Sequence, residues 1–476
     1  MGKLKLFGNS AAVLITRLSQ SVTAFVLTAA IARYLGAQEL GQYLLAFSYY
    51  FLFVNLVSQG LKVLFTRELA RNPQDTPIFL TNGTLLQLVL SILGYLALVA
   101  TVFVLPYSPD TAMACYIMGL TIIPFALSNI TEAVLQAQER MHLIAVASVP
   151  FYLLRLFVMI WVMHLGYGIN HLAIILAVSE FLILVVEWLL ILPTVQLNWK
   201  IHPDFIRRTI INARIFFAIE GIAVFNSRIQ IVLLSLLGGE LMVGVYGAIM
   251  QLMQPFLIIS NSVVVAVFPA MSKASALEQK ELTENIIEML LIMALPFFVG
   301  ILFFGDHLMR LVYGARGFEN TGIPVAIAAI FLLLIPFYRP LSFLLVANGF
   351  ERFNMRELIV TTTVGSLLGV FLISKYQLNG AALMYTLMSF LSFIQYVLVV
   401  QSRLFQLQWW KIAHRSVLVS FLMAIVFTIL SRTNMSFVAI LSISSASYCI
   451  ITASVYLSIL RRFNKIPFKA LRKRLL

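Results

Sequence analysis

Charged residues are scarce in this sequence. Only 11% of its 476 residues are charged, whereas a soluble domain usually carries about a quarter. Hydrophobic residues make up 61% of the chain, and the mean hydropathy is +0.96. Because no soluble fold could bury so much apolar surface, the composition excludes an ordinary soluble globular protein.

Cysteine is also rare, and histidine is never clustered. Cys115 and Cys449 lie far apart in apolar stretches, which argues against a disulfide framework and against a thiolate metal site. The six histidines are scattered near segment ends, and none forms an HExxH pair. The sequence therefore predicts no metal site and no cofactor.

Long apolar segments are what the chain does contain. A spanning helix needs about 20 apolar residues, and lipid cannot satisfy free backbone polar groups, so we predict an all-α polytopic membrane protein with about 14 spans. The first segment lacks a convincing cleavage site, so we expect it to remain as a helix. The predicted spans are 11–33, 42–62, 80–104, 112–135, 142–165, 171–193, 213–236, 242–268, 284–304, 322–346, 357–374, 379–400, 414–431 and 435–460.

The basic residues are distributed unevenly among the connections. Of 33 Lys and Arg, 24 fall on one side of the predicted spans, including Lys62 and the basic tail 461–476, and four fall inside spans. The five on the opposite side are Arg33, Arg310, Arg316, Lys375 and Arg432. Since basic residues accumulate in the cytoplasm, we predict that both termini are cytoplasmic. The net charge of +14 then reflects topology and anionic membrane lipids, not nucleic acid.

Two short stretches recur along the chain. The segment 35–43 is echoed at 237–246, and AQER at 137–140 is echoed by ANGFER at 347–352. Each echo falls at the same point in a count of six helices, as in transporters built from two parallel repeats. We therefore predict two lobes around a central cavity. The expected parts are an N-lobe (1–193), a cytoplasmic linker (194–212), a C-lobe (213–400), a helix pair (414–460) and the basic tail (461–476).

Several motifs indicate a family. ARYLGAQELGQY, GLKVLFTRELAR, AQERM, ANGFERF, and GVYGAIMQLMQP leading to FPAMSKA make the sequence similar to Wzx-type polysaccharide exporters. These belong to the multidrug/oligosaccharidyl-lipid/polysaccharide (MOP) superfamily, and the resemblance covers most of the chain. It implies a MATE-like pseudo-twofold repeat. It also implies a flippase for an undecaprenyl-pyrophosphate-linked oligosaccharide such as O-antigen.

The resemblance carries further expectations. It implies a place in the bacterial cytoplasmic (inner) membrane, a role in lipopolysaccharide or other surface polysaccharide synthesis, and partners among polysaccharide polymerase and chain-length proteins. The chain departs from many relatives in the seventh helix. Where they place an acidic residue, this sequence has Asn226, Ser227 and Arg228. Whether the coupling ion is a proton, sodium or none therefore stays open.

Four arginines lie inside predicted spans, namely Arg17, Arg155, Arg228 and Arg339. An arginine at membrane depth costs about 2.5–3.5 kcal/mol on insertion scales, so a set of four favours a wet cavity. The guanidinium fork matches phosphate oxygens and keeps its charge when dehydrated. We therefore predict that these residues bind the pyrophosphate. For any single arginine, pairing with a helix carboxylate is an equally good explanation.

Other polar residues in the spans are weaker candidates. Asn129 and Asn226 are predicted to hydrogen-bond sugar hydroxyls, although polar contacts between helices would account for them equally well. Glu180, Glu187 and Glu220 are candidates for ion coupling, because a nearby arginine that moves could load and release a proton.

Two other functions remain as alternatives. A multidrug exporter of the same superfamily would use acidic or aromatic pockets for organic cations, and four buried arginines disfavour it. A membrane polysaccharide polymerase or ligase would need a long outer loop with a clustered acid/base pair or metal-binding carboxylates, which the sequence lacks. We therefore expect a transporter and not an enzyme.

Overall fold

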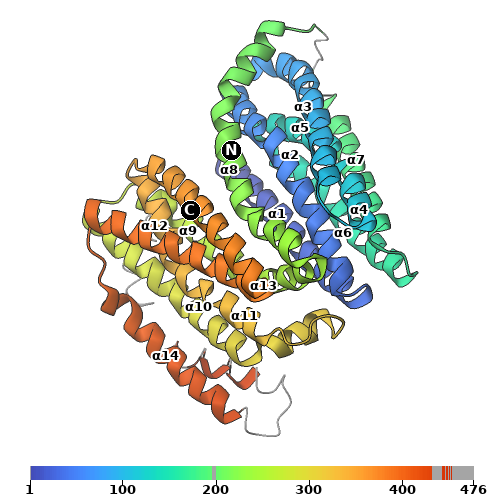
Figure 1. The fold of residues 1–476 in the computed structure, drawn as a ribbon. Coiled ribbons are helices and arrows are strands. Elements are labelled where there is room, and N and C mark those ends of the chain that lie inside the picture. The colour runs from blue at the N-terminus through green and yellow to red at the C-terminus, as the bar shows by residue number, and fades with distance from the viewer. Residues whose placement is uncertain are drawn as a thin grey trace. The chain divides into compact units, whose positions relative to one another are not determined.

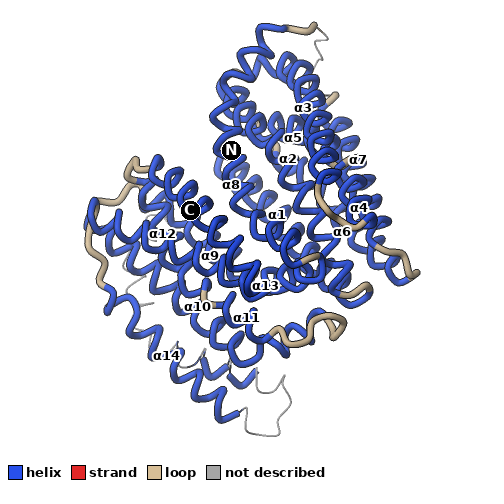
Figure 2. The backbone as a smooth tube through the Cα atoms, viewed as in Figure 1, coloured by secondary structure: helices blue, strands red, loops and turns tan. Residues whose placement is uncertain are grey.

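The fold is helical throughout the part that the structure describes. The computed structural model describes residues 2–193, 195, 200–430, 442–444, 446–448, 450 and 452. No strand occurs in these ranges, as Figure 2 shows. Twelve of the described helical segments are long and apolar enough to cross a membrane. The chain is therefore a multi-pass α-helical membrane protein.

The chain forms two compact units. Unit 1 comprises Met1–Gln251, Arg310–Glu319 and Gly369–Ala381, and unit 2 comprises Leu252–Met309, Asn320–Leu368 and Ala382–Leu476. The helices are α1 (Gly2–Tyr34), α2 (Ala37–Arg71), α3 (Thr76–Val104), α4 (Pro109–Gly119), α5 (Ile122–Ala137), α6 (Met141–His164), α7 (Ile169–Ile191), α8 (Pro203–Gly238), α9 (Glu240–Met271), α10 (Ala276–Tyr313), α11 (Gly322–Ala329), α12 (Phe331–Ala347), α13 (Glu351–Arg403) and α14 (Trp409–Leu430), with a 3₁₀ turn at Pro73–Asp75 (Figure 1). One unit boundary falls inside α9, not in the predicted linker.

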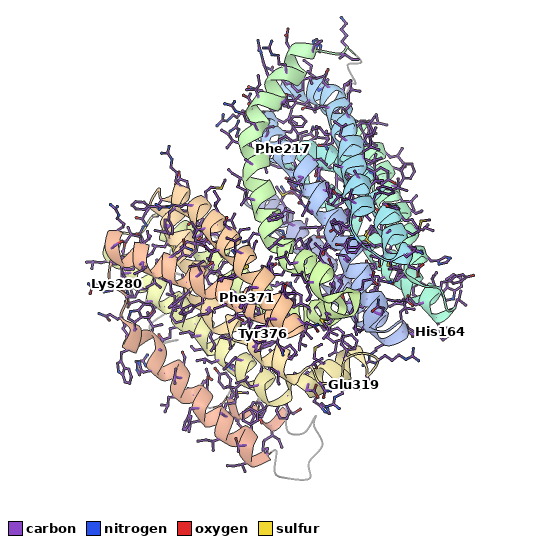
Figure 3. The ribbon with its side chains drawn as sticks, in the orientation of Figure 1. His164, Phe217, Lys280, Glu319, Phe371 and Tyr376 are labelled. Carbon is purple, nitrogen blue, oxygen red and sulfur yellow. The ribbon has the colours of Figure 1, made fainter. Side chains whose placement is uncertain are left out.

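Helix α2 lies at the centre of unit 1. It contacts α8, α5, α4 and α3, and its buried Leu61, Leu64 and Phe65 belong to an apolar core shared with α3 and α5. A Cβ on Gly60 would lie 2.8 Å from the ring of Phe217, which is labelled on α8 in Figure 3. Close packing against α8 therefore requires glycine at position 60.

The fourth and tenth predicted spans are each broken into two helices. Pro124 has no N–H to offer the carbonyl of Leu120, which accepts from the Ile123 amide at 3.3 Å instead. In the tenth span, the carbonyl of Ile330 likewise accepts from the Leu333 amide at 3.1 Å. The breaks give the α4/α5 and α11/α12 pairs, and they occupy the same place in the six-helix count.

Unit 2 packs around α9, α10, α12 and the second half of α13. The backbone of α13 turns at Gln377, where φ is 50° and ψ is −118°. One predicted span therefore lies before this turn and another lies after it. Helix α14 is held to α10 by two ion pairs. Lys411 bonds Glu284 at 3.3 Å, and Arg415 lies 3.8 Å from Glu288, so the pairs join positions four residues apart on both helices.

Thirteen of the predicted spans coincide with described helices. The remaining span, 435–460, lies mostly outside the described residues, as do Arg432, Cys449 and the tail 461–476. Helix α8 begins at Pro203, ten residues before the predicted span, so half of the predicted linker is helical. Asn82 fixes the backbone that leads into α8. Its side chain accepts from the His202 amide at 2.8 Å and donates to the Lys200 carbonyl at 3.2 Å.

Candidate functional site

Arg228 lies on the side of α8 that packs against α2. Its guanidinium carbon is 4.4 Å from the ring centre of Phe51 and 5.7 Å from that of Phe47. Its Nε is buried and makes no hydrogen bond, and no carboxylate pairs with it among the described residues. Two aromatic faces stabilise the charge without using up the donors. Arg228 therefore keeps its hydrogen-bonding fork available for an anion.

Arg155 is paired inside unit 1. Its Nη1 donates to Glu180 Oε1 at 2.6 Å and to Ser179 Oγ at 3.2 Å, and its guanidinium lies 5.1 Å from the ring of Tyr152. The Tyr152 hydroxyl accepts from Gln20 at 3.1 Å. The side chains of Arg155 and Glu180 are only 15% and 7% exposed. The structure thus gives Arg155 the carboxylate partner that the sequence left as an alternative.

Lys62 joins a second, partly buried network. The sequence assigned it to the cytoplasmic connection, but α2 continues to Arg71 and the Lys62 ammonium contacts Glu132 and, at 2.9 Å, Asn129. The Asn129 amide donates in turn to Ser58 at 2.9 Å. Both ends of the Asn129 amide are occupied here, so its predicted bond to sugar stays a prediction.

Glu187 is the most deeply buried of the predicted coupling carboxylates. Its side chain is fully buried, and Oε2 accepts from Thr131 Oγ1 at 2.5 Å. Its other oxygen, Oε1, is buried and has no hydrogen-bond partner among the described residues. Glu187 therefore retains an acceptor that could take a proton or a cation, whereas Glu180 is committed to Arg155.

The remaining predicted site residues do not belong to the Arg155 or Lys62 networks described above. Arg17 on α1 and Arg339 on α12 are exposed, and Arg339 belongs to unit 2. Glu220 is half-buried and makes no ion pair among the described residues. Asn226 is half-buried and already has a contact within the protein. Their roles in binding and coupling stay predictions.

Unit 2 contains a buried carboxylate that sequence reasoning missed. Glu357, only 5% exposed, accepts from Thr361 at 2.8 Å, from Ser392 at 2.5 Å and from Tyr396 at 3.1 Å. These donors lie on both halves of α13. The sequence placed Glu357 at the first residue of a predicted span, where an acidic residue does not indicate a buried site. The sequence signal was the hydroxyl side chain of Thr361, one turn further along the helix.

Another carboxylate joins the starts of α2, α4 and α9. Glu240 Oε2 accepts from Gln38 at 2.7 Å and Gln42 at 3.0 Å, while Oε1 accepts from Ser108 at 2.8 Å and from Thr111. Beside it, the Tyr107 hydroxyl bridges Tyr49 and Ser235. Burial raises the pKa of Tyr107, which keeps its phenol protonated. This network organises one end of unit 1 and occupies both carboxylate oxygens of Glu240.

A protein family matches most of the same region. The sequence profile of the family described as "Polysaccharide biosynthesis protein" matches residues 30–317, which is more than half of the chain. The matched segment includes Lys62, Arg155, Glu187 and Arg228. No curated protein sequence matches the chain at a significant level.

Solved structures share the fold at low sequence identity. A lipid II flippase MurJ in an inward closed conformation is 16% identical with a TM-score of 0.74, covering 95% of this chain and 99% of that one. An inward-facing multidrug resistance MATE family transporter of the MOP superfamily is 15% identical with a TM-score of 0.67, covering 83% and 98%. A MOP superfamily transporter from Pyrococcus furiosus is 14% identical with a TM-score of 0.58, covering 84% and 95%. The chain therefore belongs to the polysaccharide biosynthesis protein family and has the fold of the MOP superfamily.

Proposed function

We propose that this protein is a flippase that moves an undecaprenyl-pyrophosphate-linked oligosaccharide from the cytoplasmic to the outer leaflet of the bacterial inner membrane. It works by alternating access, and no covalent chemistry is involved. The family match supports a role in polysaccharide synthesis, and the fold supports a transporter. The orientation with both termini in the cytoplasm rests on the distribution of Lys and Arg.

Arg228 is the observation that carries the proposal. A guanidinium inside a spanning helix is costly unless it has a partner or a function. Arg155 has its carboxylate, but among the described residues Arg228 has only the faces of Phe47 and Phe51. A pyrophosphate offers the bidentate oxygens that the guanidinium lacks. We therefore assign Arg228 the main role in holding the phosphates, with Arg17 and Arg339 as further candidates.

Glu187 is the carboxyl that we propose for ion coupling. Its free oxygen is buried, and its neighbour Thr131 is on α5, the helix that also carries Glu132 and Asn129 of the Lys62 network. Binding of a cation or proton at Glu187 would alter the balance of charge in this network. Such a change is the kind of local electrostatic event that shifts a transporter between two states.

The test is complementation of a strain in which the gene is deleted. Arg228→Gln should reduce surface polysaccharide at least about tenfold at a normal protein level, because a neutral amide cannot replace a charge-assisted phosphate contact. The lipid-linked oligosaccharide should accumulate in the cytoplasmic leaflet. Arg228→Lys should retain part of the export, since it keeps the charge and loses the fork.

Arg67→Gln is the matched control. Arg67 of α2 lies 5.4 Å from the ring of Phe216 on α8, so it is also an arginine stacked between the same two helices, but its side chain is 46% exposed beside Glu68. Its loss should leave export unchanged. Normal export by Arg228→Gln would refute the site. Altered resistance to organic cations with intact polysaccharide would instead favour a multidrug exporter.

A further inference from the structure

Three of the five basic residues predicted to lie away from the cytoplasm converge on one pocket of unit 1. The pocket has a volume of about 490 Å³ and opens beside the last turns of α1 and α10. Its lining residues are Ala32, Arg33, Arg310, Leu311, Tyr313, Gly314, Ala315 and Arg316. None of these is acidic. The pocket therefore concentrates positive charge on the side of the membrane where the chain has least of it.

Two of the arginines are fixed by the backbone of the other segment. Arg33 of α1 donates through Nε to the Val312 carbonyl at 2.8 Å and through Nη2 to the Leu311 carbonyl of α10. Arg316 donates from Nη1 to the Tyr34 carbonyl at 3.3 Å, and its own carbonyl accepts from the Ala37 amide at 3.2 Å. Each segment thus covers the carbonyl end of the other's helix.

These bonds account for only part of the donors. A guanidinium has five N–H groups, and the bonds to carbonyls use two on Arg33 and one on Arg316. Capping of helix carbonyls explains why a cation lies at each helix end. It does not explain why further donors surround an open pocket. The backbone bonds fix the guanidinium positions, so the remaining donors are preorganised for a ligand.

Tyr313 gives a second and independent indication of a ligand. It lines the pocket, its side chain is 0% exposed, and its ring stacks on Phe318 at 5.6 Å between centres. Its hydroxyl is buried and has no hydrogen-bond partner among the described residues. A buried hydroxyl without a partner costs free energy that a bound acceptor would recover. The wall of the pocket thus holds a buried neutral donor beside the cationic ones.

The surroundings fit the headgroup of a lipid. Leu311 lines the same pocket and is 49% exposed, so an apolar surface adjoins the guanidinium groups. Phosphate oxygens accept from guanidinium and phenol donors, and an acyl or prenyl chain would follow the exposed leucine. A soluble anion would gain nothing from Leu311.

We propose that this pocket binds the phosphate headgroup of an anionic lipid in the outer leaflet, with Arg33, Arg316 and Tyr313 as donors. This goes beyond the proposed function, because it concerns what the pocket binds and not what crosses the membrane. The lipid is either a resident phospholipid or a polyprenyl pyrophosphate, and both present the same phosphate oxygens.

Native mass spectrometry of the full chain in detergent tests the site with two probes, dioleoyl phosphatidylglycerol and geranylgeranyl pyrophosphate. Tyr313→Phe should weaken binding about tenfold, because it removes one hydrogen bond to a charged acceptor and breaks none within the protein. Arg316→Gln should weaken it by a similar factor. A pyrophosphate that displaces phosphatidylglycerol at about tenfold lower concentration identifies the carrier lipid as the source, whereas comparable binding identifies a phospholipid.

Lys375→Gln is the matched control. Lys375 is also predicted to face away from the cytoplasm, but it lies near Phe371 and Tyr376, which are labelled in Figure 3, at 5.9 and 5.5 Å from their ring centres, and it does not line the pocket. Its loss should leave binding unchanged. Wild-type affinity in both Tyr313→Phe and Arg316→Gln would overturn the proposal. The flippase is tested by polysaccharide export in Arg228→Gln, and this site is tested by phosphatidylglycerol binding in Tyr313→Phe and Arg316→Gln, so failure of this site and failure of the proposed flippase are separable.

Discussion

Gly41 of α2 and Gly244 of α9 lie backbone to backbone. A Cβ on Gly41 would lie 1.8 Å from the Glu240 carbonyl oxygen, and a Cβ on Gly244 would lie 1.9 Å from the Ala37 carbonyl oxygen. Each added Cβ would also lie 2.9 Å from the other glycine's nitrogen. The contact is reciprocal, because the same offset of 203 relates Gly41 to Gly244 and Ala37 to Glu240.

Such reciprocity is what a two-fold relation between repeats produces. In an isologous contact, residue i of one copy meets residue j of the other and j meets i. The recurrence of Leu-Gly followed by Gly and Tyr in the sequence predicted the repeat, and the echoed glycines are the residues that touch. The glycines are required here by close approach and not by backbone dihedral angles.

We expect Gly41→Ala and Gly244→Ala each to destabilise the protein by about 1–3 kcal/mol, because a methyl group must push two helix backbones apart. The double variant should cost less than the sum, since the first methyl already separates the helices. Thermal unfolding of the purified protein measures both. Gly300→Ala is the control, because a Cβ there meets nothing within 4 Å. Additive or negligible effects would contradict the contact.

Glu240 should stabilise the folded protein through the four side chains that donate hydrogen bonds to it, and not through its charge alone. Glu240→Ala leaves Gln38, Gln42, Ser108 and Thr111 without their shared acceptor. We expect a cost of about 2–3 kcal/mol for Ala and about 1 kcal/mol for Gln, whose amide can still accept on one side. Asp110→Ala, an exposed carboxylate at the start of α4, should change the melting temperature little. Equal losses for Ala and Gln would show that only the negative charge matters.

The Arg155–Glu180 pair should be structural. Glu180→Leu leaves a buried guanidinium unpaired and should destabilise the protein by about 3–5 kcal/mol, whereas Arg155→Met combined with Glu180→Leu should recover most of the loss. Melting temperature reports the recovery. We expect the double variant to export polysaccharide, because the ion pair occupies Arg155. A stable double variant that fails to export would place Arg155 in contact with cargo.

The sequence predicted the spans well because apolar run length follows directly from bilayer thickness. It predicted helix ends poorly because helices continue past their apolar part. Helix α2 extends nine residues beyond Lys62, so a lysine assigned to a connection is inside the network with Glu132. The break before Ile122 follows from Pro124, which the sequence shows, because proline has no N–H for the Leu120 carbonyl.

The side-chain partners could be predicted only in part. Arg155 and Glu180 are on different helices, and whether they meet depends on how each helix is rotated about its axis. The sequence therefore left pairing and substrate binding open. The pocket containing Arg33 and Arg316 was not predictable at all, because these residues are far apart in sequence and meet only through tertiary packing.

Glu357 should hold the two halves of α13 together in unit 2. Glu357→Ala removes the acceptor of Thr361, Ser392 and Tyr396 and should cost about 2–3 kcal/mol, whereas Tyr396→Phe removes one bond and should cost about 1 kcal/mol. Combining Tyr396→Phe with Glu357→Ala should add little beyond Glu357→Ala, because the tyrosine bond is already lost. Thermal unfolding of the two single variants and the double variant measures these costs. Glu351→Gln, exposed at the start of α13, should be neutral. Full additivity would mean that Glu357 stabilises the halves by some contact other than these hydroxyls.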